Sequence, residues 1–269
     1  MWRSWWTHLT VFMQRADLHI EVRGQGAPLV LLHGWGMHGG VWAGVTDELA
    51  RHHQLHVVDL PGYGGSAALA PCTLETLAAR LIDALPAHFD VCGWSLGGQL
   101  ALTMARLYPA QVSRLVTVGA NPCFVTRADW PQGIQREVLQ LFAESLVNDY
   151  EGTLKRFLAL QARGDESARA VLARLRELLF VRGRPDQAVL EAGLTILLNA
   201  DLRSFVPDIT QRALVIHGSH DAPAPVAAGE WLAQHLPNGH LCRISGASHA
   251  PFLSHRVEFV SALTDFLHD

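Results

Sequence analysis

This sequence of 269 residues is poor in long apolar runs, in patterned cysteines and in charge. No apolar run reaches the ~18 residues that a membrane-spanning helix needs, so no membrane partner is expected. The four cysteines show neither metal-ligand spacing nor a disulfide pattern, which favours a reducing compartment and predicts no metal site. Only 17% of the residues are charged and the net charge is −4, so nothing global indicates a nucleic-acid partner.

What the sequence does have is a large apolar fraction. Hydrophobic residues make up 49% of the chain, and the length suits one large α/β domain or a domain with an insertion. The N-terminus stands apart, because its tryptophan-rich start contains only one short apolar run, too short for a signal-peptide core. We expect residues 1–16 to be an extension outside the fold. An added strand or a partner-binding arm is the alternative.

From residue 17 onward, strand-like and helix-like segments alternate. Continuous apolar runs such as residues 29–32 are typical of strands buried on both faces. The alternation predicts an α/β fold with a mostly parallel sheet covered by helices. The expected strands are 17–23, 29–32, 55–59, 89–92, 115–118, 213–216 and 241–244. The expected helices outside the middle segment are 41–51, 73–85 with Thr73 as N-cap, 99–107, 227–236 and 251–267.

The alternation breaks between residues 121 and 201, where apolar residues recur at helical spacing and no convincing strand is found. Leu154 and Phe157, for example, share one helical face. These helices either extend the core or form a cap over the C-terminal edge of the sheet. We favour the cap, because the strand pattern resumes afterwards. The predicted organisation is a core of residues 17–120 and 202–269, into which a helical cap of residues 121–201 is inserted.

The sequence Gly93-Trp94-Ser95-Leu96-Gly97 joins a strand-like run to a helix-like run. A serine on such a tight strand-to-helix turn has a strained backbone, so small residues are needed around it. Gly93 and Gly97 supply that room. The turn exposes the Ser95 hydroxyl above the sheet and predicts a nucleophile elbow.

A serine hydroxyl needs a base within hydrogen-bond reach, and the base needs an orienting acid. Asp221 and His249 each follow a predicted strand, and parallel strands bring such groups to one edge of the sheet. The chain order Ser95, Asp221, His249 is that of the α/β-hydrolases. Other candidate groups near strand ends are expected to have structural roles: His33, Asp59, His217 and His220. His255 is expected to face solvent from the last helix.

The oxyanion of an acyl-transfer intermediate needs two backbone N–H donors. The residue after the nucleophile, Leu96, supplies one, and Trp35 in the loop after residues 29–32 is expected to supply the other. His249 would take the Ser95 proton, Ser95 would attack an ester carbonyl, and water would hydrolyse the acyl-enzyme. This chemistry requires neither a metal nor a cofactor. The Trp35 ring then remains available for substrate packing or for packing within its own loop.

At this point several motifs together resemble one enzyme family. They are Leu31-Leu32-His33-Gly34-Trp35-Gly36, Val58-Asp59-Leu60-Pro61-Gly62-Tyr63-Gly64, Gly93-Trp94-Ser95-Leu96-Gly97-Gly98, Asn121-Pro122-Cys123-Phe124, Arg156-Phe157-Leu158-Ala159-Leu160-Gln161 and Ser248-His249-Ala250-Pro251-Phe252. From about Asp17 to the C-terminus, the chain resembles the pimeloyl-[acyl-carrier protein] methyl ester esterases of biotin synthesis. The elbow and the His249 loop are common among α/β-hydrolases, whereas the Trp35 loop, Trp94 and residues 156–161 are more specific.

The resemblance implies a cytoplasmic α/β-hydrolase with a helical cap. Such an enzyme cleaves the methyl ester of pimeloyl-[acyl-carrier protein], releasing methanol, and a monomer without metal or cofactor is expected. The residues implied to contact substrate are Trp35, Ser95, Leu96, Phe157, Leu158, Ala159, Leu160, Gln161 and His249. Phe157 and its neighbours would line the acyl channel, and packing inside the cap is the alternative for them.

Charge gives separate support for a carrier-protein partner. Residues 151–185 hold eight cations and four anions, a net charge of +4, which leaves −8 for the rest of the chain. An acidic carrier protein would be steered to such a segment. Arg156 and Arg169 match the family's basic cap best and are the predicted docking residues, although a solvated helix face would have the same composition.

Two other functions stay open at this stage. A related cap-bearing hydrolase acting on free short-chain esters or lactones would keep the same catalytic residues and would not need the basic cap. A non-catalytic binding protein with a hydrolase fold is disfavoured by the complete set of Ser95, Asp221 and His249.

Overall fold

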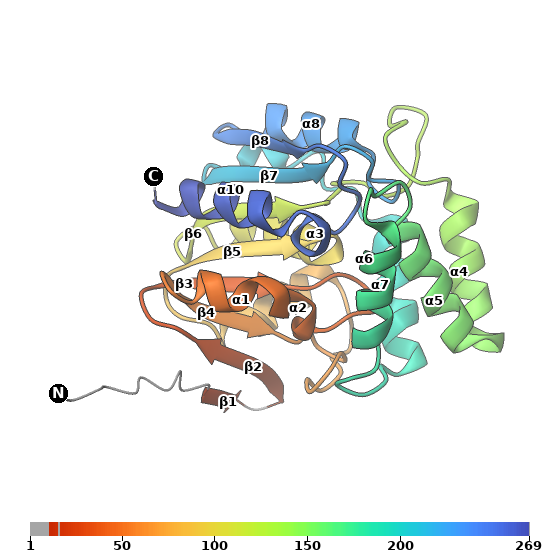
Figure 1. The fold of residues 1–269 in the computed structure, drawn as a ribbon, viewed down its shortest axis with the longest axis horizontal. Helices are drawn as coiled ribbons and strands as arrows, with labels where there is room; N and C mark the ends of the chain where they lie inside the picture. The colour runs from red at the N-terminus through yellow and green to blue at the C-terminus, as the bar shows by residue number, and fades with distance from the viewer. Residues whose placement is uncertain (1–10, 16, 269) are drawn as a thin grey trace.

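The computed structural model describes residues 11–15 and 17–268, and it is organised around one eight-stranded sheet. Along the sheet the strands follow the order β1-β2-β4-β3-β5-β6-β7-β8 (Figure 1). Their bounds are β1 Val11–Arg15, β2 Leu18–Arg23, β3 Ala27–Leu32, β4 His53–Val58, β5 Phe89–Trp94, β6 Val112–Val118, β7 Arg212–Gly218 and β8 Gly239–Ile244. The strands from β3 to β8 pair in parallel, whereas β2 pairs antiparallel with both β1 and β4.

The middle of the sheet is covered on both faces. Every residue of β5 is buried, as expected for a strand with helices above and below it. The helices outside the cap are α1 Ala43–Leu49, α2 Leu74–Ile82, α3 Leu96–Leu107, α8 Val226–His235, α9 Pro251–Ser254 and α10 Arg256–His268. Two short 3-10 helices are Gly39–Trp42 and Val206–Asp208. The predicted α/β architecture, a mostly parallel sheet flanked by helices, is therefore confirmed.

Four helices lie between β6 and β7 and form a separate layer at one side of the sheet. They are α4 Arg136–Asn148, α5 Tyr150–Gln161, α6 Ala168–Leu178 and α7 Gln187–Asn199. In Figure 1 they stand beyond the arrowhead of β5, so they cover the carboxyl ends of the parallel strands. All four fall inside residues 121–201, the segment expected to form a cap.

The N-terminal segment differs from its prediction. Val11–Arg15 pairs antiparallel with β2 instead of lying outside the fold, and so takes the added-strand alternative. The physical reason is that the outer edge of β2 carries backbone donors and acceptors that a preceding segment can satisfy through a tight turn. Asp17, with φ of 74°, lies in that turn. The rest of the predicted extension, residues 1–10 and 16, lies outside the described residues.

Most other segments agree with their predictions to within a few residues. Thr73 caps α2 by accepting a hydrogen bond from the N–H of Thr76, in a full capping box. The predicted last helix is divided at His255 into α9 and α10. No helix in the described ranges is long and apolar enough to cross a membrane.

Candidate active site

The turn between β5 and α3 has the geometry of a nucleophile elbow. Ser95 has φ of 56° and ψ of −116°, a conformation that non-glycine residues rarely adopt. Its N–H donates to the carbonyl of Val118 on β6, at 2.9 Å, which fixes the turn to the sheet. A β-carbon at position 97 would lie 2.6 Å from the carbonyl oxygens of Leu32 and His33, and one at position 93 would collide with the Gly97 carbonyl. Both glycines are therefore required by close packing.

Asp221 and His249 meet at the same edge of the sheet. Nδ1 of His249 lies 2.9 Å from each carboxylate oxygen of Asp221, and both side chains are buried. The Nδ1–H group donates to this carboxylate, and in that tautomer of the neutral ring Nε2 carries the lone pair. Nε2 of His249 is buried and has no hydrogen-bond partner among the described residues, so it is free to act as a base. The N–H of Ala224 donates to Asp221 at 2.8 Å and holds the carboxylate in place.

Gly119, at the end of β6, makes room for this pair. Its φ of 52° lies in the left-handed region. A β-carbon there would lie 3.0 Å from both Oδ2 of Asp221 and Nδ1 of His249, and 2.9 Å from the carbonyl oxygen of His249. Glycine is thus needed for the backbone conformation and for the approach of the Asp–His pair. Position 119 carried no sequence signal that pointed to this role.

The backbone of His249 is held from two sides. Its carbonyl accepts a hydrogen bond from the indole Nε1–H of Trp94, at 2.8 Å, and Trp94 directly precedes the nucleophile. Its N–H donates to the carbonyl of Gln161, at the C-terminal end of α5, at 3.3 Å. His249 is therefore tied both to the elbow and to the cap.

The loop after β3 approaches the nucleophile closely. A β-carbon at Gly34 would lie 3.2 Å from Cβ of Ser95, so the following N–H, that of Trp35, is near the elbow. The N–H of Leu96 opens α3 and has no acceptor within that helix. These are the two predicted oxyanion donors. His33 braces the loop, because its Nδ1–H donates to the Gly34 carbonyl at 2.8 Å while its Nε2 accepts from the Leu60 N–H at 2.9 Å.

Burial keeps His33 neutral. Desolvation lowers the pKa of His33 to about 4, because the fully buried ring cannot hydrate a positive charge. The neutral ring can donate from one nitrogen and accept at the other, as this brace requires. Burial also lowers the pKa of His217, which lies beside Asp221, so this ring is kept neutral in the same way. Its Nε2 lies 2.7 Å from the Ala224 carbonyl, to which it donates, and 3.5 Å from Oδ2 of Asp221.

The residues predicted to contact substrate on α5 lie on two faces of that helix. Phe157 is buried and packs edge-to-face on Trp35, with ring centroids 4.6 Å apart. The indole Nε1–H of Trp35 also donates to the Leu190 carbonyl on α7, at 2.9 Å. These contacts tie Trp35 to the cap. Leu158 and Gln161 are buried as well, whereas Ala159 and Leu160 line an outer groove.

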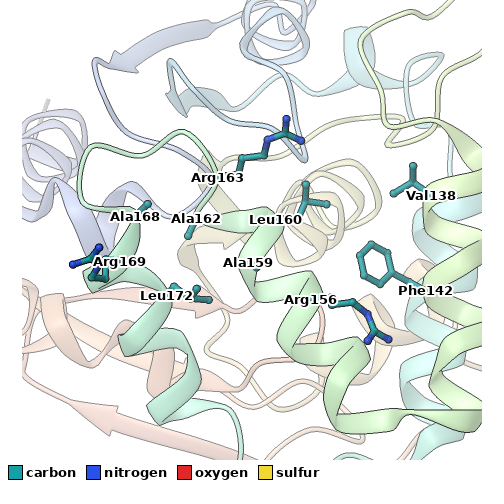
Figure 2. Close-up of a pocket in the computed structure, with 10 residues that line it drawn as sticks. All are labelled: Val138, Phe142, Arg156, Ala159, Leu160, Ala162, Arg163, Ala168, Arg169 and Leu172. Carbon is teal, nitrogen blue, oxygen red and sulfur yellow. The ribbon is translucent and has the colours of Figure 1, made fainter.

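That groove has a volume of about 660 Å³ and lies between α4, α5 and α6 (Figure 2). Its walls are mainly apolar, with Phe142 and Leu172 on opposite sides. Three cationic side chains border it: Arg156, Arg163 and Arg169. An apolar groove with a basic rim suits a partner that presents an acidic surface and an apolar segment.

The cations of residues 151–185 are not equally available. Five of the eight pair with carboxylates: Lys155, Arg156, Arg174, Arg182 and Arg184. Arg156 donates to Asp149 at 2.9 Å, so one of the two predicted docking residues already has a carboxylate partner. Arg163, Arg169 and Arg176 form no ion pair within the described ranges. The available positive charge is therefore less than the composition indicated.

Arg182 has a different position from the other cap cations. It reaches from the cap to the core and donates to Asp59 at 3.0 Å and to Glu21 at 2.7 Å. The carboxylate of Asp59 is fully buried and also accepts from the N–H groups of Gly39 and Gly65. Asp59 thus holds loops of the core together, as predicted, and in addition receives a cation from the cap.

Metal chemistry has no recognisable ligand set in this part of the molecule. Among the described residues, no group of three or more His, Cys, Asp or Glu side chains is arranged to hold a metal ion. The elbow, the Asp–His pair and the two N–H groups are the kinds of group that acyl transfer through a serine nucleophile uses.

Comparison with known proteins agrees with this geometry. Residues 27–256 match the family model described as the alpha/beta hydrolase fold. A pimeloyl-[acyl-carrier protein] methyl ester esterase of Nitrosomonas europaea is 47% identical over 246 residues, which cover 91% of this chain and 98% of that protein. Proteins of the same name from Chromobacterium violaceum and Nitrosospira multiformis are 45% and 41% identical, and cover 93% and 94% of this chain.

Solved structures share the fold at lower identity. An esterase from Exiguobacterium antarcticum superposes with a TM-score of 0.86 at 26% identity, covering 97% of this chain and all of that one. An enol-lactonase from Burkholderia xenovorans superposes with a TM-score of 0.82 at 24% identity, covering 96% of this chain. The second likeness shows the fold alone.

Proposed function

The chain belongs to the pimeloyl-[acyl-carrier protein] methyl ester esterase family of the alpha/beta hydrolases, and from this premise we propose how its own residues carry out the reaction. It is a carboxylic ester hydrolase that converts the methyl ester of pimeloyl-[acyl-carrier protein] into the free acid and methanol, a step of biotin synthesis. Ser95 is the nucleophile, His249 the general base and Asp221 the group that orients His249. We place the enzyme in the cytoplasm as a monomer.

In the first half of the reaction, Nε2 of His249 accepts the proton of the Ser95 hydroxyl while Oγ attacks the ester carbonyl. The N–H groups of Trp35 and Leu96 donate to the oxyanion, and each such donor is typically worth about 3 kcal/mol. The tetrahedral intermediate then collapses. His249 returns its proton to the methoxy oxygen, so that methanol leaves and the pimeloyl acyl group remains on Ser95.

In the second half, water repeats these steps against the acyl-enzyme. His249 takes a proton from the water, and the hydroxide attacks the acyl carbonyl. The oxyanion is held by the same two N–H groups, and His249 then protonates Oγ of Ser95 as the acid is released. Asp221 accepts the Nδ1–H of His249 in both halves and stabilises the imidazolium that forms twice per turnover.

The carrier protein would dock on the outer face of the cap. Arg156 and Arg169 border the groove between α4, α5 and α6, and Arg163 adds a cation that the sequence prediction did not include. The acyl chain would pass α5 on its way to Ser95, where Phe157 and Leu158 face inward and Ala159 and Leu160 face the groove. Gln161 lies at the end of this helix, beside the His249 loop.

One observation carries the catalytic assignment more than any other. Nδ1 of His249 is held symmetrically by Asp221 at 2.9 Å, and its opposite nitrogen is buried without a partner at the edge where the elbow presents Ser95. Other buried histidines, such as His53 and His217, also have a ring nitrogen without a partner in the described part of the chain, but in His249 the opposite nitrogen is held by both oxygens of a buried carboxylate. The unsatisfied nitrogen is what a general base requires.

The decisive measurement compares kcat/KM for pimeloyl-[acyl-carrier protein] methyl ester with kcat/KM for a free short-chain aryl ester. We expect a strong preference for the carrier-linked ester that is lost at high salt, because screening weakens the attraction between a basic groove and an acidic carrier. Ser95→Ala should abolish both activities and leave the fold intact. Good turnover of the free ester with none of the carrier-linked ester would instead support a hydrolase of free esters or lactones.

A matched pair of substitutions on α6 tests the docking surface within the same experiment. Arg169→Glu reverses a charge on the groove, whereas Arg176→Glu makes the same change on the same helix away from it. Arg169→Glu should lower kcat/KM for the carrier-linked ester about tenfold and leave the free ester unaffected. Equal effects of the two substitutions would contradict docking at the groove.

A further inference from the structure

The loop between α5 and α6, residues 162–167, is bonded to the loop that carries His249. The N–H of Glu166 donates to the carbonyl of Gly246 at 3.1 Å. The hydroxyl of Ser248 lies 2.9 Å from the carbonyl oxygen of Arg163 and 3.0 Å from that of Gln161, and its single proton is shared between these two acceptors. The cap therefore contacts the segment immediately before the catalytic base through several main-chain groups.

Asp165 is the side chain at the centre of this contact. Its Oδ2 accepts a hydrogen bond from the N–H of Ser248 at 2.9 Å, and its Oδ1 accepts from the N–H of Ser167 at 2.7 Å. Asp165 is only 7% exposed, and it forms no ion pair within the described ranges. A buried carboxylate without a cation is costly unless its oxygens accept hydrogen bonds. Here both oxygens are committed to backbone donors, one of them adjacent to His249.

These bonds restrict the position of His249. The peptide that Asp165 holds through Ser248 leads directly into His249, whose own N–H donates to Gln161 and whose carbonyl accepts from Trp94. On the other side, Nδ1 of the imidazole is fixed to Asp221. A displacement of the Ser248 peptide would therefore turn the imidazole about its carboxylate partner and move Nε2 relative to Ser95.

We propose that Asp165 is a positioning residue for the catalytic base: acting through the backbone of Ser248, it holds Nε2 of His249 at the place where it can take the Ser95 proton. The inference rests on the proposed roles of Ser95 and His249. It assigns to the cap a part in the chemical step, in addition to its part in substrate binding. Misplacement of a catalytic group by about 1 Å can cost roughly a hundredfold in rate, so a side chain outside the reacting atoms can matter to catalysis.

The test is a pre-steady-state burst with p-nitrophenyl acetate, which needs no carrier protein. The burst amplitude counts the sites able to form an acyl-enzyme, and the burst rate constant measures acylation. For Asp165→Ala we expect an amplitude close to that of the wild type per folded chain and a rate constant lower by roughly tenfold to a hundredfold. Asp165→Asn keeps one acceptor oxygen and should give an intermediate rate constant.

Two control variants separate positioning from stability. Ser167→Ala changes the same loop, but the side chain that it removes forms no capping hydrogen bond. The Ser167 N–H stays in place as a donor to Asp165. Thr73→Ala removes the cap of α2 in the core and lowers stability without touching the His249 loop. Both should keep the wild-type burst rate constant.

The outcomes are distinct. If Asp165→Ala lowers the burst amplitude while the rate constant of the remaining sites is unchanged, Asp165 only supports folding and the inference is overturned. An unchanged burst in Asp165→Ala would also overturn it. Without a burst in the wild type, acylation limits turnover, and kcat takes the place of the burst rate constant in these comparisons. If the wild type does not hydrolyse the ester, or if Ser95→Ala still forms an acyl-enzyme, the proposed roles of Ser95 and His249 fail instead.

Discussion

At the scale of single residues, the groups proposed to react are held by neighbours that take no part in the chemistry, among them Gly119 and Asp165. Ser95, Asp221 and His249 follow strand ends in an order that the sequence displays, so a pattern leads to them. Gly119 and Asp165 had no such pattern. Asp165 meets Ser248 across 83 positions of sequence, and only the folded chain brings the two together.

Gly119 offers the sharpest test at this scale. Gly119→Ala would place a β-carbon 3.0 Å from both Asp221 and His249 at a φ of 52°, so kcat should fall about a hundredfold. The strained backbone should also lower the free energy of unfolding by about 1 kcal/mol. Gly183→Ala is the matched control, because Gly183 also has a positive φ, 94°, but has no atom within 4 Å of such a β-carbon. Steady-state kinetics and urea unfolding of both variants check the prediction, and equal kcat values would contradict it.

At the scale of elements, apolar periodicity located most strands and helices because each one buries a face. Apolar periodicity does not predict which segment pairs with the edge strand of a sheet. The pairing of β1 with β2 was therefore only an alternative at the level of the sequence. It also cannot identify which loops of the cap contact which loops of the core. His38 illustrates this, since its Nε2–H donates to the Leu178 carbonyl at the end of α6, at 2.8 Å.

The ion pairs of Arg182 make the attachment of the cap measurable. Arg182→Gln would leave the fully buried carboxylate of Asp59 without its cation, so the free energy of unfolding should fall by about 3 kcal/mol. Arg184, two residues after Arg182, forms an exposed ion pair with Glu151. Arg184→Gln breaks that pair and should lower the free energy of unfolding by less than about 1 kcal/mol. Chemical denaturation followed by circular dichroism measures both values. Similar losses for the two variants would show that the core–cap pair adds nothing beyond a surface contact.

At the scale of the whole molecule, neutral buried histidines set its response to acid. Burial lowers the pKa of several histidines below the usual 6.5: His33, His38, His53, His56 and His217. Between the lowered folded pKa and the unfolded value, the unfolded chain binds more protons than the folded chain. Stability therefore rises with pH across that window and is lost as the pH falls through it.

For His33 the window runs from pH 6.5 down to about 4. The difference of about 2.5 pKa units corresponds to about 3 kcal/mol of stability lost on acidification. His33→Gln keeps a donor and an acceptor for Gly34 and Leu60 but does not titrate, so its free energy of unfolding should change less over this range. Urea denaturation at a series of pH values measures the two slopes. If the free energy of unfolding depends on pH equally in the wild type and in His33→Gln, His33 does not contribute to the loss of stability in acid.

The contacts between cap and core also bear on modular engineering. Caps of α/β-hydrolases invite exchange as units, yet here the loop after α5 is matched to the Ser248 peptide, and Arg182 is matched to Asp59 and Glu21. A chimera that replaced residues 121–201 of this chain with another cap would leave the buried Asp59 carboxylate without its cation and the Ser248 N–H without its acceptor. The transplantable unit is therefore the cap together with the core loops it bonds, a discontinuous set of segments that no single cut in the gene isolates.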